Sequence, residues 1–143
     1  MRLWHYKLIP YLPKSQLLAQ WRELNSIFKN QPKHILINYV YEYPKNDLKE
    51  YACIVIEEMK KRGFKIKNMA NFEAYFGSKL LPAPIDGKLF RYHHDKRYLL
   101  QCFYNLQEKL DRGQEDFNLN TYTKLIEFMR ANYMGYSLGF KEV

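Results

Sequence analysis

The feature that most constrains the fold is the recurrence of apolar residues at steps of three and four. It is clearest in residues 15–29, where one stripe comprises Leu17, Leu18, Trp21, Leu24, Ile27 and Phe28. This spacing places the side chains on one face of an α-helix, whereas a strand repeats every second residue. Pro32 disfavours continuation of the helix. The pattern therefore predicts a helix over 15–29.

Similar stripes predict further helices. One begins at a capping pair, Asp47 and Glu50, and ends at Gly63. The others cover residues 71–76, 95–112 and 120–132, with a loop marked by Pro82 and Pro84. A chain of 143 residues suits one domain. We therefore expect an all-α fold over 1–143, a compact single domain of three main helices with long connecting loops and an extra C-terminal helix.

The composition limits the classes of molecule that the protein could bind. The net charge of +8 and the pI near 9.4 favour a polyanion, either nucleic acid or an acidic membrane face. No apolar run is long enough to span a bilayer, and the N-terminus lacks the layout of a signal peptide. We expect a soluble, cytoplasmic protein with no membrane partner. The histidines and the two cysteines lack metal-ligand spacing, so we expect no metal and two free, buried thiols.

One carboxylate stands out on the polar side of the first predicted helix. At ~100° per residue, Glu23 shares that side with Gln16, Ala19 and Gln20, while Arg22 lies about a quarter-turn away. Most such glutamates are simply solvated. The alternative is a functional acid with room for a ligand beside it.

Three blocks of sequence carry a resemblance that favours the functional acid. They are Arg2-Leu3 with Leu12 and 16–24, then 54–66, and then 106–110. In this order they resemble the pyrimidine-dimer DNA glycosylases of the phage endonuclease V type, and His34, 38–40 and 97–102 match bacterial members. The resemblance covers residues 1 to 112.

The resemblance implies a mechanism. In that family the N-terminal α-amine attacks the sugar C1′ of a damaged nucleotide, forms a Schiff base, and the backbone is cut by β-elimination. An α-amine suits this step because its unperturbed pKa, about 7.7–8.0, leaves a neutral fraction near pH 7. Carried over, Glu23 takes the acid/base role, Arg22 contacts DNA and Arg2 contacts the phosphate backbone. No cofactor is implied.

The nucleophile is assigned to Met1. The phage-type enzymes expose a small residue after methionine removal, whereas the bulky Arg2 is expected to block that removal here. Residues 1–11 are expected to form an extended arm that places the Met1 amine against the start of the first helix.

The chain also departs from the family. Ser26 and Asn105 stand where the phage-type enzymes have arginines, although Lys109, expected to contact DNA, is kept. After Gly113 the resemblance fades into the predicted helix 120–132 and an aromatic segment at 133–136. This difference leaves the substrate preference open.

The segment 34–43 allows two interpretations. Its alternating Ile35, Ile37, Tyr39 and Tyr41 locally predict a strand, but a lone strand cannot satisfy its own ladder groups. The resemblance implies a loop and turn there, which we adopt. Tyr39 and His34 are candidate DNA contacts, Tyr39 by stacking on an extruded base. The other interpretation is a Tyr-rich segment packed on helices.

The sequence therefore favours a DNA glycosylase with abasic-site lyase activity, acting as a monomer on double-stranded DNA that carries a pyrimidine dimer, related damage or an abasic site. A milder form keeps only the lyase. The alternative class is a non-enzymatic basic DNA-binding module, motivated by Ser26, Asn105 and the changed C-terminal part.

Overall fold

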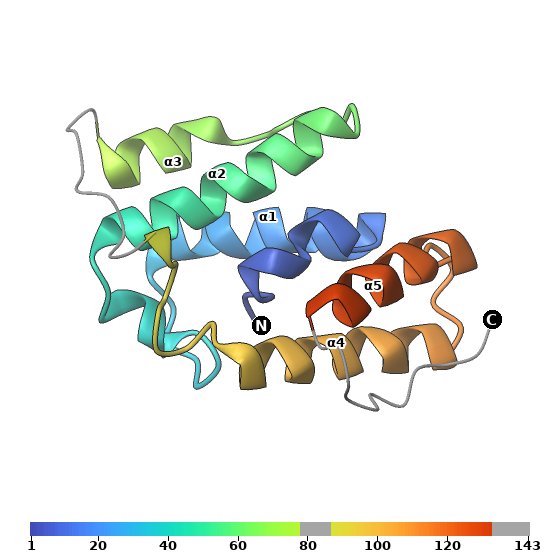
Figure 1. The fold of residues 1–143 in the computed structure, drawn as a ribbon. Helices are drawn as coiled ribbons and strands as arrows, with labels where there is room; N and C mark the ends of the chain where they lie inside the picture. Colours follow the sequence, from blue (N-terminus) through green and yellow to red (C-terminus); the bar gives the residue numbers. More distant parts are fainter. Residues whose placement is uncertain (78–86, 133–143) are drawn as a thin grey trace.

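The structure is a computed structural model that describes residues 1–77 and 87–132 (Figure 1). Within these ranges every regular element is a helix. The α-helices are α1 (Lys14–Asn30), α2 (Lys45–Lys61), α3 (Met69–Phe76), α4 (Lys96–Asp111) and α5 (Leu119–Asn132). Two 3-10 helices, η1 (Tyr6–Tyr11) and η2 (Asn38–Tyr41), complete the list. The prediction of an all-α fold is confirmed.

The apolar stripe of the first predicted helix is buried against neighbouring helices, as its spacing predicts. Leu17, Trp21 and Leu24 are buried, as are Ile27 and Phe28, and α1 packs on α2 and α3. The helix ends at Gln31, whose left-handed backbone directs its N–H to the carbonyl of Ile27. The other predicted helices also appear, with small shifts at their ends.

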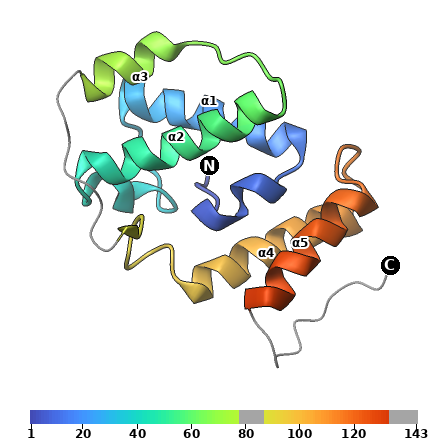
Figure 2. The ribbon, with the colours of Figure 1, turned by 45° about the horizontal axis from the view of Figure 1, so that its top comes forward.

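The N-terminal segment lies inside the molecule. Figures 1 and 2 show the start of the chain between the layer of α1, α2 and α3 and the pair α4 and α5. η1 contacts α2, α4 and α5. Leu3, Leu8, Ile9 and Leu12 are fully buried. The expectation of an extended arm is therefore wrong for residues 6–11, because this apolar run is wound into a helix and buried between the layers.

The strand pattern of residues 34–43 is also not realised, and the turn that we adopted is confirmed. The buried side chains of this segment are Ile37 and Val40, three residues apart, as a helical turn requires. Ile35, which the strand pattern would place beside Ile37, is 86% exposed.

The capping pair predicted for the second helix is wrong. α2 begins at Lys45 after Pro44, which makes no side-chain cap. The Asp47 carboxylate is buried and instead accepts the N–H of Phe90 at 2.9 Å. Because that partner is distant in sequence, the local pattern could not reveal it.

Other expectations have mixed outcomes. Both cysteines are free thiols, with Cys102 buried and Cys53 only partly buried. The predicted loop at Pro82 and Pro84 and the segment 133–136 lie outside the described residues. Among the helices that the structure describes, none is both long and apolar enough to cross a bilayer.

Candidate active site

The start of the chain lies against the middle of α1. The backbone N–H of Arg2 donates to Glu23 Oε2 at 3.4 Å, although the two residues are 21 positions apart. The positive Met1 amine is near enough to counteract part of the rise in the pKa of Glu23. The structure thus brings Met1, Arg2 and Glu23 together, at mid-helix and not at the helix start that the sequence suggested.

Gln20 holds the N-terminal segment against Glu23. Its side chain is buried, and Nε2 donates to Arg2 O at 3.1 Å and to Glu23 Oε2 at 3.2 Å. Its Oε1 accepts the N–H of Trp4 at 2.8 Å. One amide therefore binds the N-terminal segment on both sides of Leu3 and also the candidate catalytic carboxylate.

The sequence placed Gln20 beside Glu23 but did not reveal its role. The available signal was its position three residues before Glu23 on the same helix face. An amide at that spacing can reach the carboxylate, but its bonds to Arg2 and Trp4 depend on how the N-terminal segment folds.

Two tyrosines from other helices hold the same segment. The Tyr51 hydroxyl, on α2, lies 2.6 Å from Trp4 O and 2.9 Å from Gln20 Oε1. The Tyr98 hydroxyl, on α4, donates to Leu3 O. Three helices therefore fix the backbone of residues 2–4, and with it the direction in which the Met1 amine leaves the core.

The environment of Glu23 favours its protonated form relative to a fully solvated glutamate. Burial raises the pKa of Glu23, while the Arg2 N–H, the Met1 amine and the Gln20 amide act in the opposite direction. Glu23 remains partly accessible. A carboxyl group with a raised pKa near solvent can exchange a proton with a bound substrate, as general acid–base catalysis requires.

Two buried histidines continue the hydrogen-bonded framework. His5 Nδ1 accepts the N–H of Lys7 at 3.1 Å, so its Nε2–H donates to His94 O at 2.9 Å. His94 Nδ1 accepts the N–H of Tyr6 at 3.2 Å, so its Nε2–H donates to the Tyr39 hydroxyl at 2.6 Å. Burial lowers the pKa of both rings, that of His5 to about 4. Both histidines are therefore neutral at pH 7.

The residues predicted to bind DNA lie in different settings. The Arg2 guanidinium carbon is 5.8 Å from the centre of the Tyr98 ring. Arg22 is exposed and lines a groove of about 550 Å³ between α1 and residues 63–68. This groove combines an apolar floor, including Trp21 and Phe64, with a cationic rim that includes Lys65.

The other three predicted DNA contacts lie farther along the chain. His34 is exposed in the turn before η2, whereas Tyr39 is half-buried with its ring stacked on His93 at 4.5 Å between centroids. Lys109 is half-buried near the end of α4, where it lines a cavity of about 350 Å³ with Asn105. Because His93 stacks on Tyr39 and the rings of Phe90 and Tyr43 meet it edge to face, little of the Tyr39 ring is left for a base.

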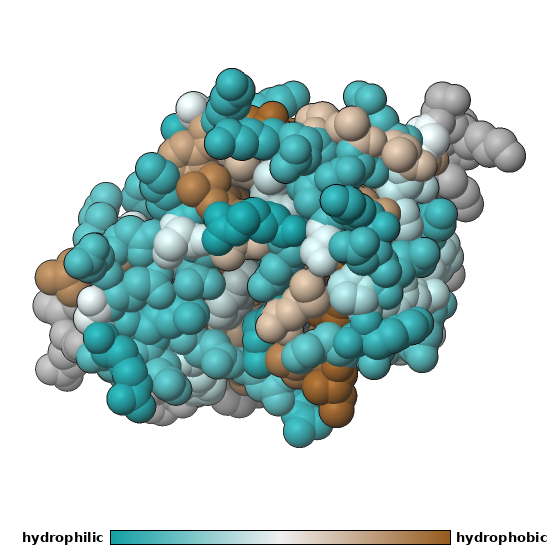
Figure 3. Space-filling model, turned by 180° about the vertical axis from the view of Figure 1, so that it is seen from behind, coloured by the Kyte–Doolittle hydropathy of each residue, from teal (hydrophilic) through white to brown (hydrophobic). Residues whose placement is uncertain are grey.

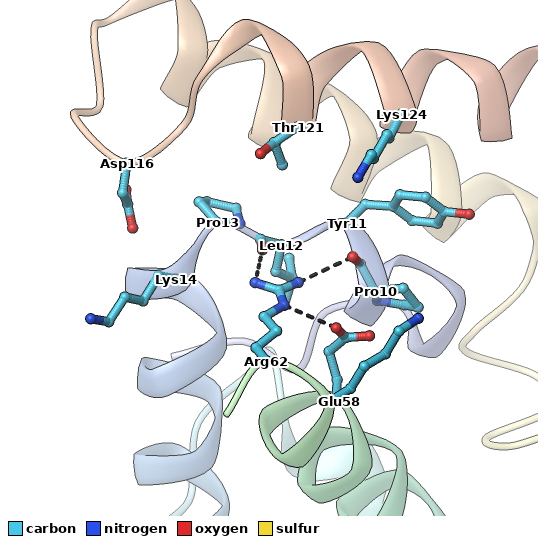
Figure 4. A pocket seen from close by; sticks show the side chains of 11 residues that line it. Pro10, Tyr11, Leu12, Pro13, Lys14, Glu58, Arg62, Asp116, Thr121 and Lys124 are labelled. Carbon is cyan, nitrogen blue, oxygen red and sulfur yellow. Dashed lines mark hydrogen bonds and ion pairs between the residues drawn. The ribbon is translucent and has the colours of Figure 1, made fainter. Parts of the chain in front are cut away.

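A larger cavity, of about 590 Å³, is lined by residues that support the N-terminal segment (Figure 4). Arg62 projects into it and donates to Leu12 O at 2.7 Å and Pro10 O at 3.1 Å, and it pairs with Glu58 at 2.9 Å. These bonds tie the end of η1 to α2. Within residues 1–77 and 87–132, no three His, Cys, Asp or Glu side chains gather to form a metal site.

Comparison with known proteins identifies the family. The family model for pyrimidine dimer DNA glycosylase matches residues 1–72, half of the chain. No curated protein and no solved structure matches the chain. The matched region contains Met1, Gln20, Glu23 and the helix that positions the last two. The chain therefore belongs to the pyrimidine dimer DNA glycosylase family.

Proposed function

We propose that the protein excises damaged bases, pyrimidine dimers or related lesions, and cuts the resulting abasic site as a lyase. The observation that carries the proposal is the hydrogen-bonded set of Arg2, Gln20 and Glu23, which holds the start of the chain against a carboxyl group of raised pKa. An amine and an acid held together are the two groups that imine-forming base excision needs.

The reaction proceeds from the neutral Met1 amine. Its nitrogen forms a bond to C1′ of the damaged nucleotide as the C1′–base bond breaks, and protonated Glu23 supplies a proton to the departing base. Ring opening transfers a proton from the nitrogen to the sugar O4′ and gives the iminium, whose positive charge the now ionised Glu23 stabilises. The Glu23 carboxylate accepts a C2′ proton as the bond to the 3′ phosphate breaks, which completes β-elimination. Hydrolysis of the iminium then releases the sugar fragment and restores the Met1 amine.

We propose that DNA is bound by residues on several elements. Arg2 follows Met1 and Arg22 precedes Glu23 in the chain, and His34, Tyr39 and Lys109 are the further proposed contacts. With a net charge of +8, the protein attracts the phosphate backbone, and its affinity should fall steeply with salt. We propose that one 143-residue domain acts as a monomer on duplex DNA in the cytoplasm.

A base-release and strand-cleavage assay tests this proposal. Duplexes that differ only in one cyclobutane dimer, one abasic site or neither are incubated with the protein. We expect cleavage of both damaged duplexes and none of the control. Cleavage of the abasic duplex alone would reduce the function to the lyase. Salt-sensitive binding without any cleavage would instead support the DNA-binding module motivated by Ser26 and Asn105.

A further inference from the structure

The turn formed by residues 34–37 exposes apolar side chains in an unusual way. Ile35 is 86% exposed and its neighbour Leu36 is 40% exposed. Figure 3 shows hydrophobic groups projecting from the lower edge of a mainly hydrophilic face. Single exposed apolar residues are ordinary, but two adjacent ones at the tip of a turn need a reason.

The turn is rigid. The N–H of His34 donates to Asn38 Oδ1 at 2.7 Å, and His34 O accepts the N–H groups of Ile37 and Asn38, each at 2.9 Å. The N–H of Leu36 donates to His34 Nδ1 at 3.2 Å. At the base of the turn, the Tyr41 hydroxyl donates to Pro32 O at 2.7 Å. The apolar tip is therefore held out by its backbone and does not collapse onto the surface.

The surroundings of the turn match a polyanion. Lys33 precedes the tip, and its Nζ lies 4.8 Å from the centre of the Tyr41 ring, where it remains at the surface. The segment also reaches the candidate active site, because Tyr39 bonds His94 and lies within the electrostatic influence of Arg2. The segment that carries the turn is therefore connected through Tyr39 to His94 and to the surroundings of Arg2.

We propose that Ile35 and Leu36 form an apolar wedge that enters the base stack of duplex DNA beside the damaged nucleotide. The proposal rests on the proposed function, because a nucleotide inside a duplex must leave the stack before an enzyme can act on it. An aliphatic side chain between base pairs unstacks them and loses its contact with water. The hydrogen bonds that close the turn limit the ordering cost of insertion, and Lys33, two residues before Ile35, supplies a positive charge for the adjoining phosphate.

Two variants and one control test the wedge. Ile35→Ser and the double variant I35S/L36S remove apolar surface that makes no contribution to the core. Leu119→Ser is the matched control, because Leu119 is 57% exposed at the first position of α5. The melting temperature should be unchanged in all three.

The first readout needs binding but no catalysis. A duplex carries a tetrahydrofuran abasic analogue with 2-aminopurine on its 3′ side, and fluorescence reports unstacking. Wild type and Leu119→Ser should raise the fluorescence, whereas the double variant should lose most of the rise. An equal rise in the double variant overturns the wedge, even if the protein has no catalytic activity.

The second readout separates the wedge from the chemistry. Borohydride trapping is measured on one abasic strand, as a duplex and as a single strand, which has no stack to open. We expect the double variant to trap the duplex about tenfold more slowly, from the loss of buried apolar area, and the single strand at the wild-type rate. Absence of trapping by wild type on either substrate refutes the proposed function. If the double variant traps the duplex at the wild-type rate, the wedge is refuted.

Discussion

The two halves of the molecule contribute differently to the site. Residues 1–72 contain the amine, Gln20 and Glu23. The second half supplies Tyr98, whose hydroxyl donates to Leu3 O, and His94, which bonds the His5 ring and the Tyr39 hydroxyl. The family model matches the first half alone. On the proposed function, the chemistry depends on particular side chains in the first half, and the second half supports them. Changes in the first half should therefore affect activity more than changes in the second.

Glu23→Gln should have the largest effect. Losing the carboxyl group that protonates the departing base should slow base release by roughly 10³-fold, as for a lost general acid. Trapping on a preformed abasic site should persist, since the amine is intact. Glu57→Gln is the matched control, because Glu57 is an exposed glutamate of α2. Similar base release by wild type and E23Q would remove Glu23 from the mechanism.

The buried His5–His94 contact joins the two halves and should make the stability of the folded protein sensitive to acid. Because burial lowers the pKa of His5 to about 4, the unfolded chain binds more protons below pH 6.5. Stability is therefore full above pH 6.5 and falls as the pH drops to 4, by on the order of 3 kcal/mol for His5 alone. Urea unfolding at pH 7, 5.5 and 4 measures this.

A pair of variants isolates that contribution. His5→Gln should flatten the pH dependence of the unfolding free energy, whereas His34→Gln, at an exposed position, should leave it unchanged. The same slope in wild type and H5Q would show that other groups cause the acid sensitivity.

Gln20→Met tests whether a residue of the first half acts by aligning the amine with Glu23. The variant keeps the shape but leaves the buried Trp4 N–H without a partner, which costs about 1–3 kcal/mol of stability. We expect base release to slow about tenfold as the amine and the acid lose their alignment. The pH–rate midpoint due to Glu23 should move upward, because the Gln20 bond now lowers its pKa.

The control for this variant is Gln16→Met, on the same helix. Gln16 donates to Gln114 at 3.3 Å, toward residues 114–116, whereas Gln20 bonds residues 2–4. A slower rate in Q20M with an unmoved pH midpoint would show that Gln20 is only structural.

Tyr98→Phe should have the smallest effect. It removes one hydrogen bond to Leu3 O and should cost about 1 kcal/mol of stability, with base release reduced only a few-fold. Denaturation and steady-state rates measure both. If Y98F were as inactive as E23Q, the division between chemical and supporting halves would be wrong.

Elements that depend on local spacing could be predicted from the sequence, whereas those that depend on contacts between distant residues could not. The stripe from Leu17 to Phe28 gave α1 because helical spacing is local. The strand pattern at 34–43 failed because burial of Ile37 and Val40, and not alternation, decides that segment. Asp47 was misassigned for a similar reason, since its partner Phe90 lies 43 residues away.

The candidate site divides in the same way. Glu23 could be selected from the helix pattern and the family resemblance. Gln20, Tyr51 and Tyr98 could not, because their roles depend on where the N-terminal segment runs through the core. His94 was one of four scattered histidines until the fold placed it on His5.

The most direct test of the account is to identify the atom that attacks the sugar. The protein is trapped with borohydride on abasic DNA, digested, and the cross-linked peptide is sequenced by mass spectrometry. The account predicts that the added sugar is on the N-terminal peptide, at the Met1 nitrogen, and that acetylation of that amine abolishes trapping. A cross-link on a lysine side chain, or undiminished trapping by the acetylated protein, would contradict it.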